Sequence, residues 1–265
     1  MSDLNVVNMK LNYGAMWMLA KRELLEFWRN KTRLISSLVQ GILFLLVFSN
    51  GFGALTPIIG GTQVEQKAFA ASGISAIIIL FTGIFGGMGV MRDKMFGFMK
   101  ELIVAPVSRR TLMLGKTLGV ALQTLIQVCI IVSLSIALGY LGFNISLIWR
   151  ILLILPVALL ASIGIVGMGL TISTRMRDFQ SFGLIQTFIV MPMFMLSGAF
   201  FSFDTAGILR PVMLGNPFTY SVDLFRAVLL GVSSLPIWLD ILVMTAFGTI
   251  MILLGARSFN RMEVS

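Results

Sequence analysis

The 265-residue sequence contains no histidine, a single cysteine and few charged residues, and each scarcity excludes a class of function. Without histidine, the chain lacks the commonest general base and metal ligand. Cys129 is alone in an apolar run, which excludes disulfides and cysteine metal sites. Charged residues make up 12% of the chain, about half the share found in soluble domains. With 57% hydrophobic residues and a mean hydropathy of +0.97, the sequence is that of an integral membrane protein.

The eleven acidic residues all lie in loops or near the ends of apolar runs. Ion-coupled carriers and intramembrane proteases need ionisable groups at membrane depth. The cluster Gly86, Gly87 and Gly89 lies inside an apolar run, with no following Lys-Ser or Lys-Thr, so it is not a phosphate loop. We therefore expect no catalytic residue, no bound metal and no internal energy source, so the chain is not expected to be an enzyme.

Six apolar runs have the length of about 20 residues that a spanning helix needs. Sixteen lysines and arginines lie on one side of these runs and four on the other, which places both termini in the cytoplasm by the positive-inside rule. The same rule accounts for the net charge of +9 without a nucleic-acid partner. The predicted fold is an all-α membrane domain over residues 34–256, with spans near 34–53, 68–91, 117–140, 150–173, 180–201 and 237–256, followed by a cytoplasmic tail at 257–265.

The first 33 residues are predicted to form a tail and an amphipathic helix lying in the membrane interface. From about residue 11 to residue 30, an apolar face carries Trp17 and Phe27, while Arg22, Glu23 and Arg29 lie elsewhere on the helix. Tryptophan favours headgroup depth, and the cations can face acidic lipid or a partner protein. An anchor that only fixes topology and a surface that contacts a partner are both compatible with this pattern.

A charged segment, Met91–Lys116, separates the second and third predicted spans. Its first half has apolar residues at helical spacing, which predicts an amphipathic helix. Pro106 is expected to end that helix, and Ser108 to cap the next one. A basic helix and turn between two spans predicts a platform on the cytoplasmic surface.

The third and fifth spans carry amides and hydroxyls that lipid does not favour. Gln123 and Gln127 are one turn apart, so they either bond to neighbouring helices or line a polar path. In the fifth span Pro192 predicts a kink among flexible methionines, which either fill the core or contact a ligand. The candidate path residues are Gln123, Gln127, Gln186, Thr187, Met191 and Met195.

The segment MRDKMFGFMKELIVAPVSRRTLMLGK resembles the loop between the second and third spans of ABC-2 type permeases. These are the membrane subunits of ATP-driven exporters, including the daunorubicin-resistance and nodulation-protein-J groups. The matching positions are Glu101, Leu102, Val104, Ala105, Pro106, Val107, Ser108, Arg109, Gly115 and Lys116.

A second match runs from the end of the fifth predicted span into the outer segment 202–236, which prolines break into expected short helices dipping into the outer leaflet. The matching positions are Ser197, Gly198, Phe200, Phe201, Asn216, Pro217, Thr219, Tyr220, Asp223 and Arg226, and Ser202 departs from the usual proline.

The resemblance implies two cytoplasmic ABC ATPase subunits that bind ATP and magnesium, with no cofactor on this chain. It also implies a second permease protomer, most simply an identical one, in the lipid of a prokaryotic plasma membrane. The ATPase-coupling residues would lie in the loop 92–116: Arg92, Asp93, Lys94, Phe98, Lys100, Glu101, Pro106 and Arg109. The external gate would contain Phe200, Phe201, Asn216, Pro217, Phe218, Tyr220 and Arg226, with the aromatic residues as its apolar plug.

The expected function is export of a hydrophobic or amphipathic compound, either a drug-like molecule or a lipid. Export of a lipid-linked polysaccharide is an alternative within the same class. A membrane scaffold or immunity protein that does not transport is an alternative from another class. A channel is a third alternative, but the sequence has no ring of charges and no carbonyl filter motif.

Overall fold

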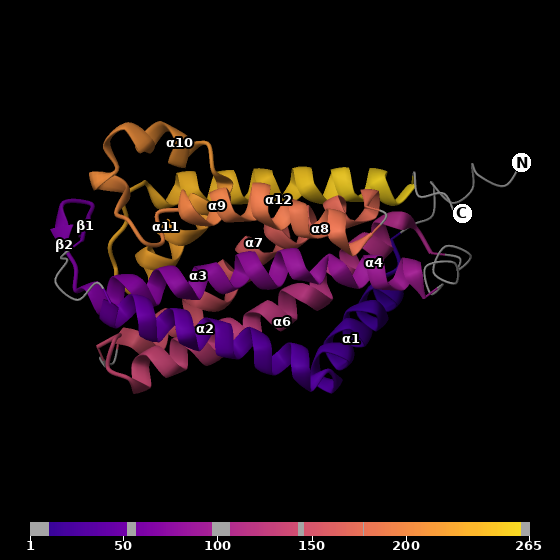
Figure 1. Ribbon diagram of the computed structural model, residues 1–265, viewed down its shortest axis with the longest axis horizontal. Coiled ribbons are helices and arrows are strands. Elements are labelled where there is room, and N and C mark those ends of the chain that lie inside the picture. The colour runs from indigo at the N-terminus through magenta and orange to yellow at the C-terminus, as the bar shows by residue number, and fades with distance from the viewer. Residues whose placement is uncertain (1–10, 52–56, 97–106, 143–145, 177, 261–265) are drawn as a thin grey trace, which may run out of the picture.

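The structure, a computed structural model, describes residues 11–51, 57–96, 107–142, 146–176 and 178–260. Long helices run side by side along the long axis of the molecule (Figure 1). Helices α1 (Tyr13–Arg29) and α4 (Met88–Met95) lie at one end, called the α1/α4 end below. A small hairpin with α10 (Arg210–Leu214) and α11 (Pro217–Leu229) lies at the opposite end, called the hairpin end.

Five helices of the described chain are long and apolar enough to cross a membrane. They coincide with five of the six predicted spans, although α6 begins several residues earlier than predicted, directly after its cap Ser108. The Ser108 side chain accepts a hydrogen bond from the Thr111 amide at 3.1 Å, which confirms the predicted cap. The five are α2 (Lys31–Gly51), α3 (Gln66–Gly86) continued by α4, α6 (Arg109–Ala137), α7 (Ser146–Arg175) and α12 (Ile237–Asn260).

A shorter apolar helix occupies the place of the predicted fifth span and ends at Met195 instead of continuing towards residue 201. It consists of α8 (Phe179–Ile185), a π-helical turn (Gln186–Val190) and α9 (Met191–Met195). The Met191 amide bonds to the Gln186 carbonyl, which is the wider spacing of a π turn. The irregularity expected at Pro192 is therefore a π turn directly before it, and the count of six spans stays a prediction.

The outer segment consists of short helices, as its prolines predicted. Two 3-10 turns, Phe203–Thr205 and Gly207–Leu209, precede α10 and α11. Beside them lies an antiparallel hairpin, β1 (Ile58–Ile59) and β2 (Thr62–Gln63), which the sequence analysis did not predict. The Ser202 hydroxyl donates to the Ile58 carbonyl and joins the two regions.

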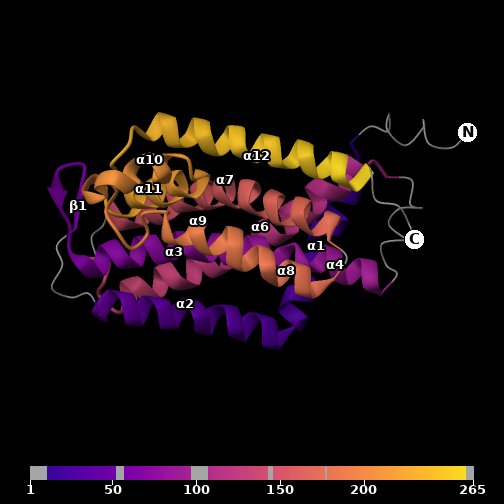
Figure 2. The same cartoon turned by 45° about the horizontal axis from the view of Figure 1, so that its top comes forward.

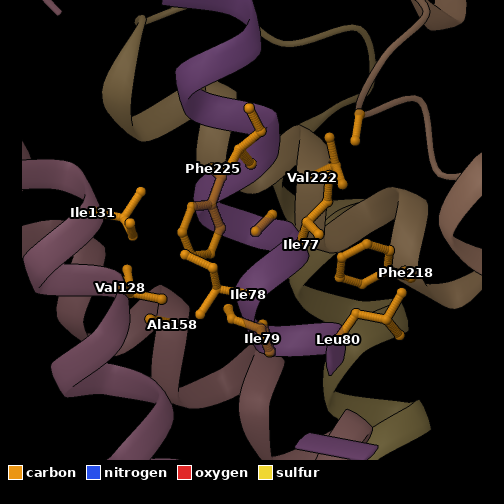
Figure 3. Packing of buried hydrophobic residues seen from close by; sticks show 14 of the residues in the cluster. Ile77, Ile78, Ile79, Leu80, Val128, Ile131, Ala158, Phe218, Val222 and Phe225 are labelled. Atoms are coloured by element: carbon orange, nitrogen blue, oxygen red, sulfur yellow. The ribbon is translucent and has the colours of Figure 1, made fainter. Parts of the chain in front are cut away.

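The core is organised around α3, which contacts α2, α6, α7 and α11. Figure 2 shows α3 behind α8 and α9, between α2 on one side and α11 and α12 on the other. Figure 3 shows the α3 residues Ile77 to Leu80 in the centre of this packing. They are surrounded by Val128 and Ile131 of α6, Ala158 of α7, and Phe218, Val222 and Phe225 of α11. The second predicted span is thus the central helix of the bundle.

Candidate functional site

A buried lysine connects three helices at the α1/α4 end. The Lys116 Nζ of α6 lies 2.8 Å from Glu23 Oε1 of α1 and 2.5 Å from Asp93 Oδ2 of α4. The side chains of all three residues are at most 6% exposed. Arg22 adds an ion pair to Asp93 at 2.9 Å, and Arg92 pairs with Glu26. We call these six residues the ion network; it connects the N-terminal helix to the start of the charged segment.

Two glycines of α6 allow α1 to approach closely enough for these bonds. A Cβ atom at Gly119 would lie 2.6 Å from the Glu23 Cβ, and one at Gly115 would lie 2.9 Å from the Leu19 Cβ. Both distances are shorter than side chains tolerate, so the helices can pack this closely only without those atoms. Gly115 and Gly119 flank Lys116 on the sequence, which explains the Gly-Lys pair of the charged segment in structural terms.

The positions of Glu23 and Lys116 correct two expectations. Glu23 was expected away from the apolar face of its helix, and Lys116 was counted as a loop cation, but both are buried. Each is buried because it neutralises the other, together with Asp93. Trp17 and Phe27, predicted to share one apolar face, differ in environment: Trp17 is exposed, which is compatible with the predicted interfacial position, whereas Phe27 packs inward.

Replacing Gly119 with alanine is expected to separate α1 from α6. The added methyl group overlaps the Glu23 Cβ, and overpacking of this kind costs about 1–3 kcal/mol. We expect a lower midpoint of thermal unfolding in detergent and faster proteolysis at α1. Gly183→Ala in α8 is the matched control, because a Cβ there meets nothing within 4 Å. Equal stability of the two variants would show that the close contact is not needed.

The predicted coupling residues are only partly within the described chain. Phe98, Lys100, Glu101 and Pro106 lie outside the described residues. Arg92 and Asp93 belong to the ion network. Lys94 Nζ donates to the carbonyls of Thr174 at 2.8 Å and Met176 at 3.3 Å, which ties α4 to the end of α7. Arg109 is half-buried at the first position of α6. The segment 97–106 is therefore bounded by helices that are fixed to the bundle on both sides.

A cavity of about 460 Å³ lies between α2 and α3 and reaches the ion network. Its walls are mainly apolar, and Phe44 of α2 and Phe81 of α3 line it with their rings in edge contact, 6.2 Å between centroids. Its polar groups include Gln40 and Gln127, and Arg92 lies at its α1/α4 end. The volume is within the range of about 300–1,000 Å³ that is typical of ligand pockets. The other lining residues are Phe27, Ser36, Ser37, Gly41, Ile77, Ile78, Thr82, Phe85, Met88 and Gly89.

The two glutamines of the third span make bonds between helices. The Gln127 side chain donates to the Ser37 hydroxyl at 2.8 Å and accepts from Thr82, so it joins α6 to α2 and α3. Gln123 donates to the Glu23 carbonyl at 2.8 Å. Of the candidate path residues, Gln127 also lines the cavity. The others do not line it, and Thr187, Met191 and Met195 lie on the exposed face of the α8–α9 helix.

Phenylalanines close the cavity towards the hairpin end. The ring centroid of Phe194 in α9 lies 6.1 Å from that of Phe44, 5.5 Å from that of Phe81 and 4.9 Å from that of Phe200. Phe48 completes the group at 4.1 Å from Phe200. The sequence predicted a plug of Phe200, Phe201, Phe218 and Tyr220, but the structure does not bring these four together. Phe201 is exposed, and Phe218 is buried in the core against α3.

The residues of the Asn-Pro-x-Thr-Tyr motif fix the start of α11. Asn216 caps the helix by accepting from the Phe218 amide at 3.0 Å, and its amide donates to the Met193 carbonyl at 2.7 Å. Pro217 follows in the first turn, where its missing amide proton costs nothing. The Tyr220 hydroxyl donates to the Leu214 carbonyl at 2.8 Å. The motif thus attaches α11 to α9 and α10.

Arg226 is the largest fully enclosed side chain of the outer region. Its guanidinium donates to the carbonyls of Gly198 at 2.7 Å and Ala199 at 3.3 Å, and it lies 3.8 Å from the centre of the Phe69 ring. Gly198 has a φ of +77°, which favours glycine and turns its carbonyl towards the arginine. Burial lowers the pKa of Arg226 to about 10, so it is charged at neutral pH. Arg226 therefore links α11 to α3 and to the end of α9.

Carboxylates also enter the outer part of the bundle. Asp223 accepts from the Ser234 and Leu235 amides at 3.0 and 2.9 Å, and Asp240 of α12 is fully buried. From the sequence, these carboxylates were expected in loops or near the ends of apolar runs, and their burial was not predicted. Asp240 lies in the first turn of α12, whereas Asp223 is in the middle of α11 and is bonded to the loop that leads to α12.

These features define a multi-pass membrane protein in which an ion network at one end adjoins an apolar cavity. Comparison with known proteins agrees. A family model described as ABC-2 type transporter matches residues 14–230. The chain belongs to the ABC-2 type transporter family.

Relatives carry the names of transport and resistance proteins. Nodulation protein J of Rhizobium leguminosarum bv. trifolii is 25% identical over 228 residues, 83% of this chain and 82% of the relative. The probable doxorubicin resistance ABC transporter permease protein DrrC of Mycobacterium tuberculosis is 23% identical over 239 residues, 88% of this chain and 84% of the relative. The putative transport permease ycf38 of Pyropia yezoensis is 32% identical over 123 residues, 46% of this chain, and the match spans less than half, 42%, of that relative.

Proposed function

We propose that this chain is the membrane subunit of an exporter that moves a hydrophobic or amphipathic compound out of the cytoplasm or the inner leaflet. Two copies of a cytoplasmic ATP-binding subunit, which carries ATP and magnesium, supply the energy. A second permease protomer, most simply an identical one, completes the path in a prokaryotic plasma membrane. The family membership and the names of the relatives support the class of this proposal.

The observation that carries the proposal is the ion network at the α1/α4 end. Asp93 bonds to Lys116 and Arg22, so the helix that leads into the segment 97–106 is tied to both α1 and α6. A displacement of that segment by a bound ATPase would be passed to α1 and α6 through short bonds between buried charges. Tightly packed contacts of this kind transmit small shifts better than a flexible loop does.

The cavity supports an apolar cargo. Its walls between α2 and α3 are lined by phenylalanine and isoleucine, and it begins beside the ion network. The phenylalanine group of Phe44, Phe48, Phe81, Phe194 and Phe200 lies between the cavity and the hairpin end. We place the α1/α4 end in the cytoplasm because most loop cations lie there. In that orientation the phenylalanine group is the barrier that the ATPase must open.

Export of a lipid-linked polysaccharide is the second candidate function. A sugar chain needs a long path with aromatic and polar walls, whereas this cavity has few polar groups and lies within one protomer. A scaffold without transport activity would require neither the cavity nor the buried network. Both features therefore favour the exporter of an apolar compound.

The test is ATP hydrolysis by the chain after co-purification with its ATPase in lipid nanodiscs. We expect the wild-type complex to hydrolyse ATP, and Glu101→Lys or Pro106→Ala in the charged segment to lower the rate or dissociate the ATPase. Glu65→Lys is the matched control, because Glu65 is an exposed carboxylate at the hairpin end. If no ATPase binds the wild-type chain, the scaffold alternative is favoured. If Glu65→Lys loses as much activity as the variants of the charged segment, the ATPase does not dock specifically on that segment.

A further inference from the structure

We propose that the cavity between α2 and α3 binds one membrane amphiphile with an anionic head, held within a single protomer. Its apolar part would lie against the wall that Phe44, Phe81 and Phe85 form, and its head beside Lys21 and Arg29 of α1. This deepens the proposed function by assigning a substrate class to a site, and it rests on that function for the cytoplasmic position of the head.

The apolar part of the site is preformed. Phe44 and Phe81 belong to two helices that diverge around the cavity, and Phe85 extends the wall towards α4. Gln40 lies among these rings and makes no side-chain hydrogen bond with any other described residue. An amide in this position can bond to the ester or hydroxyl groups that join an apolar chain to its head.

The charged part of the site is a second cleft of about 780 Å³ between α1 and α4. Arg92 lines both the cavity and the cleft, so the two meet at this residue. The cleft is lined by four cations, Lys21, Arg22, Arg29 and Arg92, and by two carboxylates, Glu26 and Asp93.

The excess of cations selects the charge of the head. Ion pairs neutralise Arg92 with Glu26 and Arg22 with Asp93. Lys21 and Arg29 are exposed, and neither makes an ion pair within the described part of the chain. A cationic amphiphile would meet repulsion here, and a small inorganic anion would leave the apolar cavity unfilled. An anionic head with an attached apolar chain satisfies both parts, and the membrane leaflet around the α1/α4 end supplies such molecules.

The experiment measures binding of lysophosphatidylglycerol to the purified full-length chain in a neutral detergent by native mass spectrometry. Lysophosphatidylcholine with the same acyl chain tests the head. We expect one tightly held lysophosphatidylglycerol per protomer, with at least tenfold weaker binding of lysophosphatidylcholine. Gln40→Trp should fill the cavity and weaken binding of lysophosphatidylglycerol at least tenfold. Ile35→Trp is the matched control, since Ile35 is an exposed residue of the same helix that does not line the cavity.

A charge variant tests the head independently of the cavity. The double variant Lys21→Gln with Arg29→Gln should remove the preference for lysophosphatidylglycerol and leave binding of lysophosphatidylcholine unchanged. Lys67→Gln with Arg210→Gln removes the same charge at the hairpin end and should change nothing. All four of these residues are exposed, so the charge variants should fold normally. They therefore still test the proposal if Gln40→Trp is unstable. Equal binding of both lipids to the wild type, or the same loss in both charge variants, would overturn the proposal.

The outcome is separate from that of the proposed function. Binding is measured without an ATPase, so a bound amphiphile with no ATP hydrolysis would keep the site and reject the exporter. ATP hydrolysis that depends on Glu101 and Pro106, in a chain that binds neither lipid, would keep the exporter and reject this site.

Discussion

Replacement of Lys116 with methionine is expected to be among the most destabilising single changes in this chain. Methionine nearly matches the length of the lysine stem but leaves Glu23 without a partner and removes one of the two ion pairs of Asp93. Breaking a buried ion pair from one side costs about 3–5 kcal/mol, because an uncompensated charge stays buried. The free energy of unfolding in mixed detergent micelles should fall by this amount, and the variant should be recovered in low yield.

Two further variants separate the lost charge from lost packing. Arg110→Met, in the first turn of α6, removes a cation that is exposed and should leave stability unchanged. The triple variant Lys116→Met, Glu23→Gln, Asp93→Asn removes the buried carboxylates as well and should recover most of the lost stability. If Lys116→Met is as stable as Arg110→Met, the ion network does not hold the three helices together.

The second large effect is expected at Arg226. Arg226→Met removes the donors to the Gly198 and Ala199 carbonyls and the stacking on Phe69. Charge-assisted hydrogen bonds contribute about 1.5–3 kcal/mol and a desolvated cation–π contact about 2 kcal/mol, so a loss of roughly 3.5–5 kcal/mol is expected. The same measurement of unfolding in detergent applies, and a cysteine introduced at the end of α9 should be labelled faster as the loop detaches.

Arg226→Lys refines this prediction. Lysine keeps the charge but cannot present the planar group that both stacks on a ring and bonds to two carbonyls, so it should recover only part of the stability. Arg210→Met is the matched control at the same end of the molecule. Arg210 also lies over a ring, Phe203 at 4.8 Å, but it is exposed. Full recovery by lysine would show that charge alone matters at position 226.

The helices could be placed from the sequence because their signals are local. An apolar run of about 20 residues indicates a spanning helix whatever the neighbouring sequence is. The Ser108 cap is equally local, because its hydroxyl bonds to an amide only three residues away. The outer region was likewise identified from its prolines. Pro192 did not specify the form of the break, since the π turn before it depends on how the whole helix packs.

The ion network could not be predicted because its partners are distant in the sequence. Lys116 bonds to Glu23, which lies 93 residues away in the sequence. From its position alone, Lys116 is indistinguishable from the other cations of the basic segment. The spacing of Gly115 and Gly119 around it was an available signal for a close helix contact. The pair Gly60-Gly61 was a similar signal for the hairpin.

The aromatic group shows the same limit. Phe200 was predicted as part of an external gate, but its ring partners come from α2 and α9 and not from the outer segment. The aromatic residues nearest to it in the sequence, Phe201 and Phe218, lie elsewhere. Position along the chain indicated the region, and only the packing of the helices determined which rings meet.

The carboxylates of the outer region have a consequence for how this side of the molecule can open. Asp204 accepts from the Gly60 amide at 2.6 Å and from the Ser234 hydroxyl at 3.1 Å, and Asp223 holds the Ser234 amide. These hydrogen bonds join the hairpin, the turn at Asp204 and the connection to α12 into one rigid unit. A rigid unit of this kind moves as a whole. Access to the cavity from the hairpin end should therefore change between a closed and an open state, without intermediate positions.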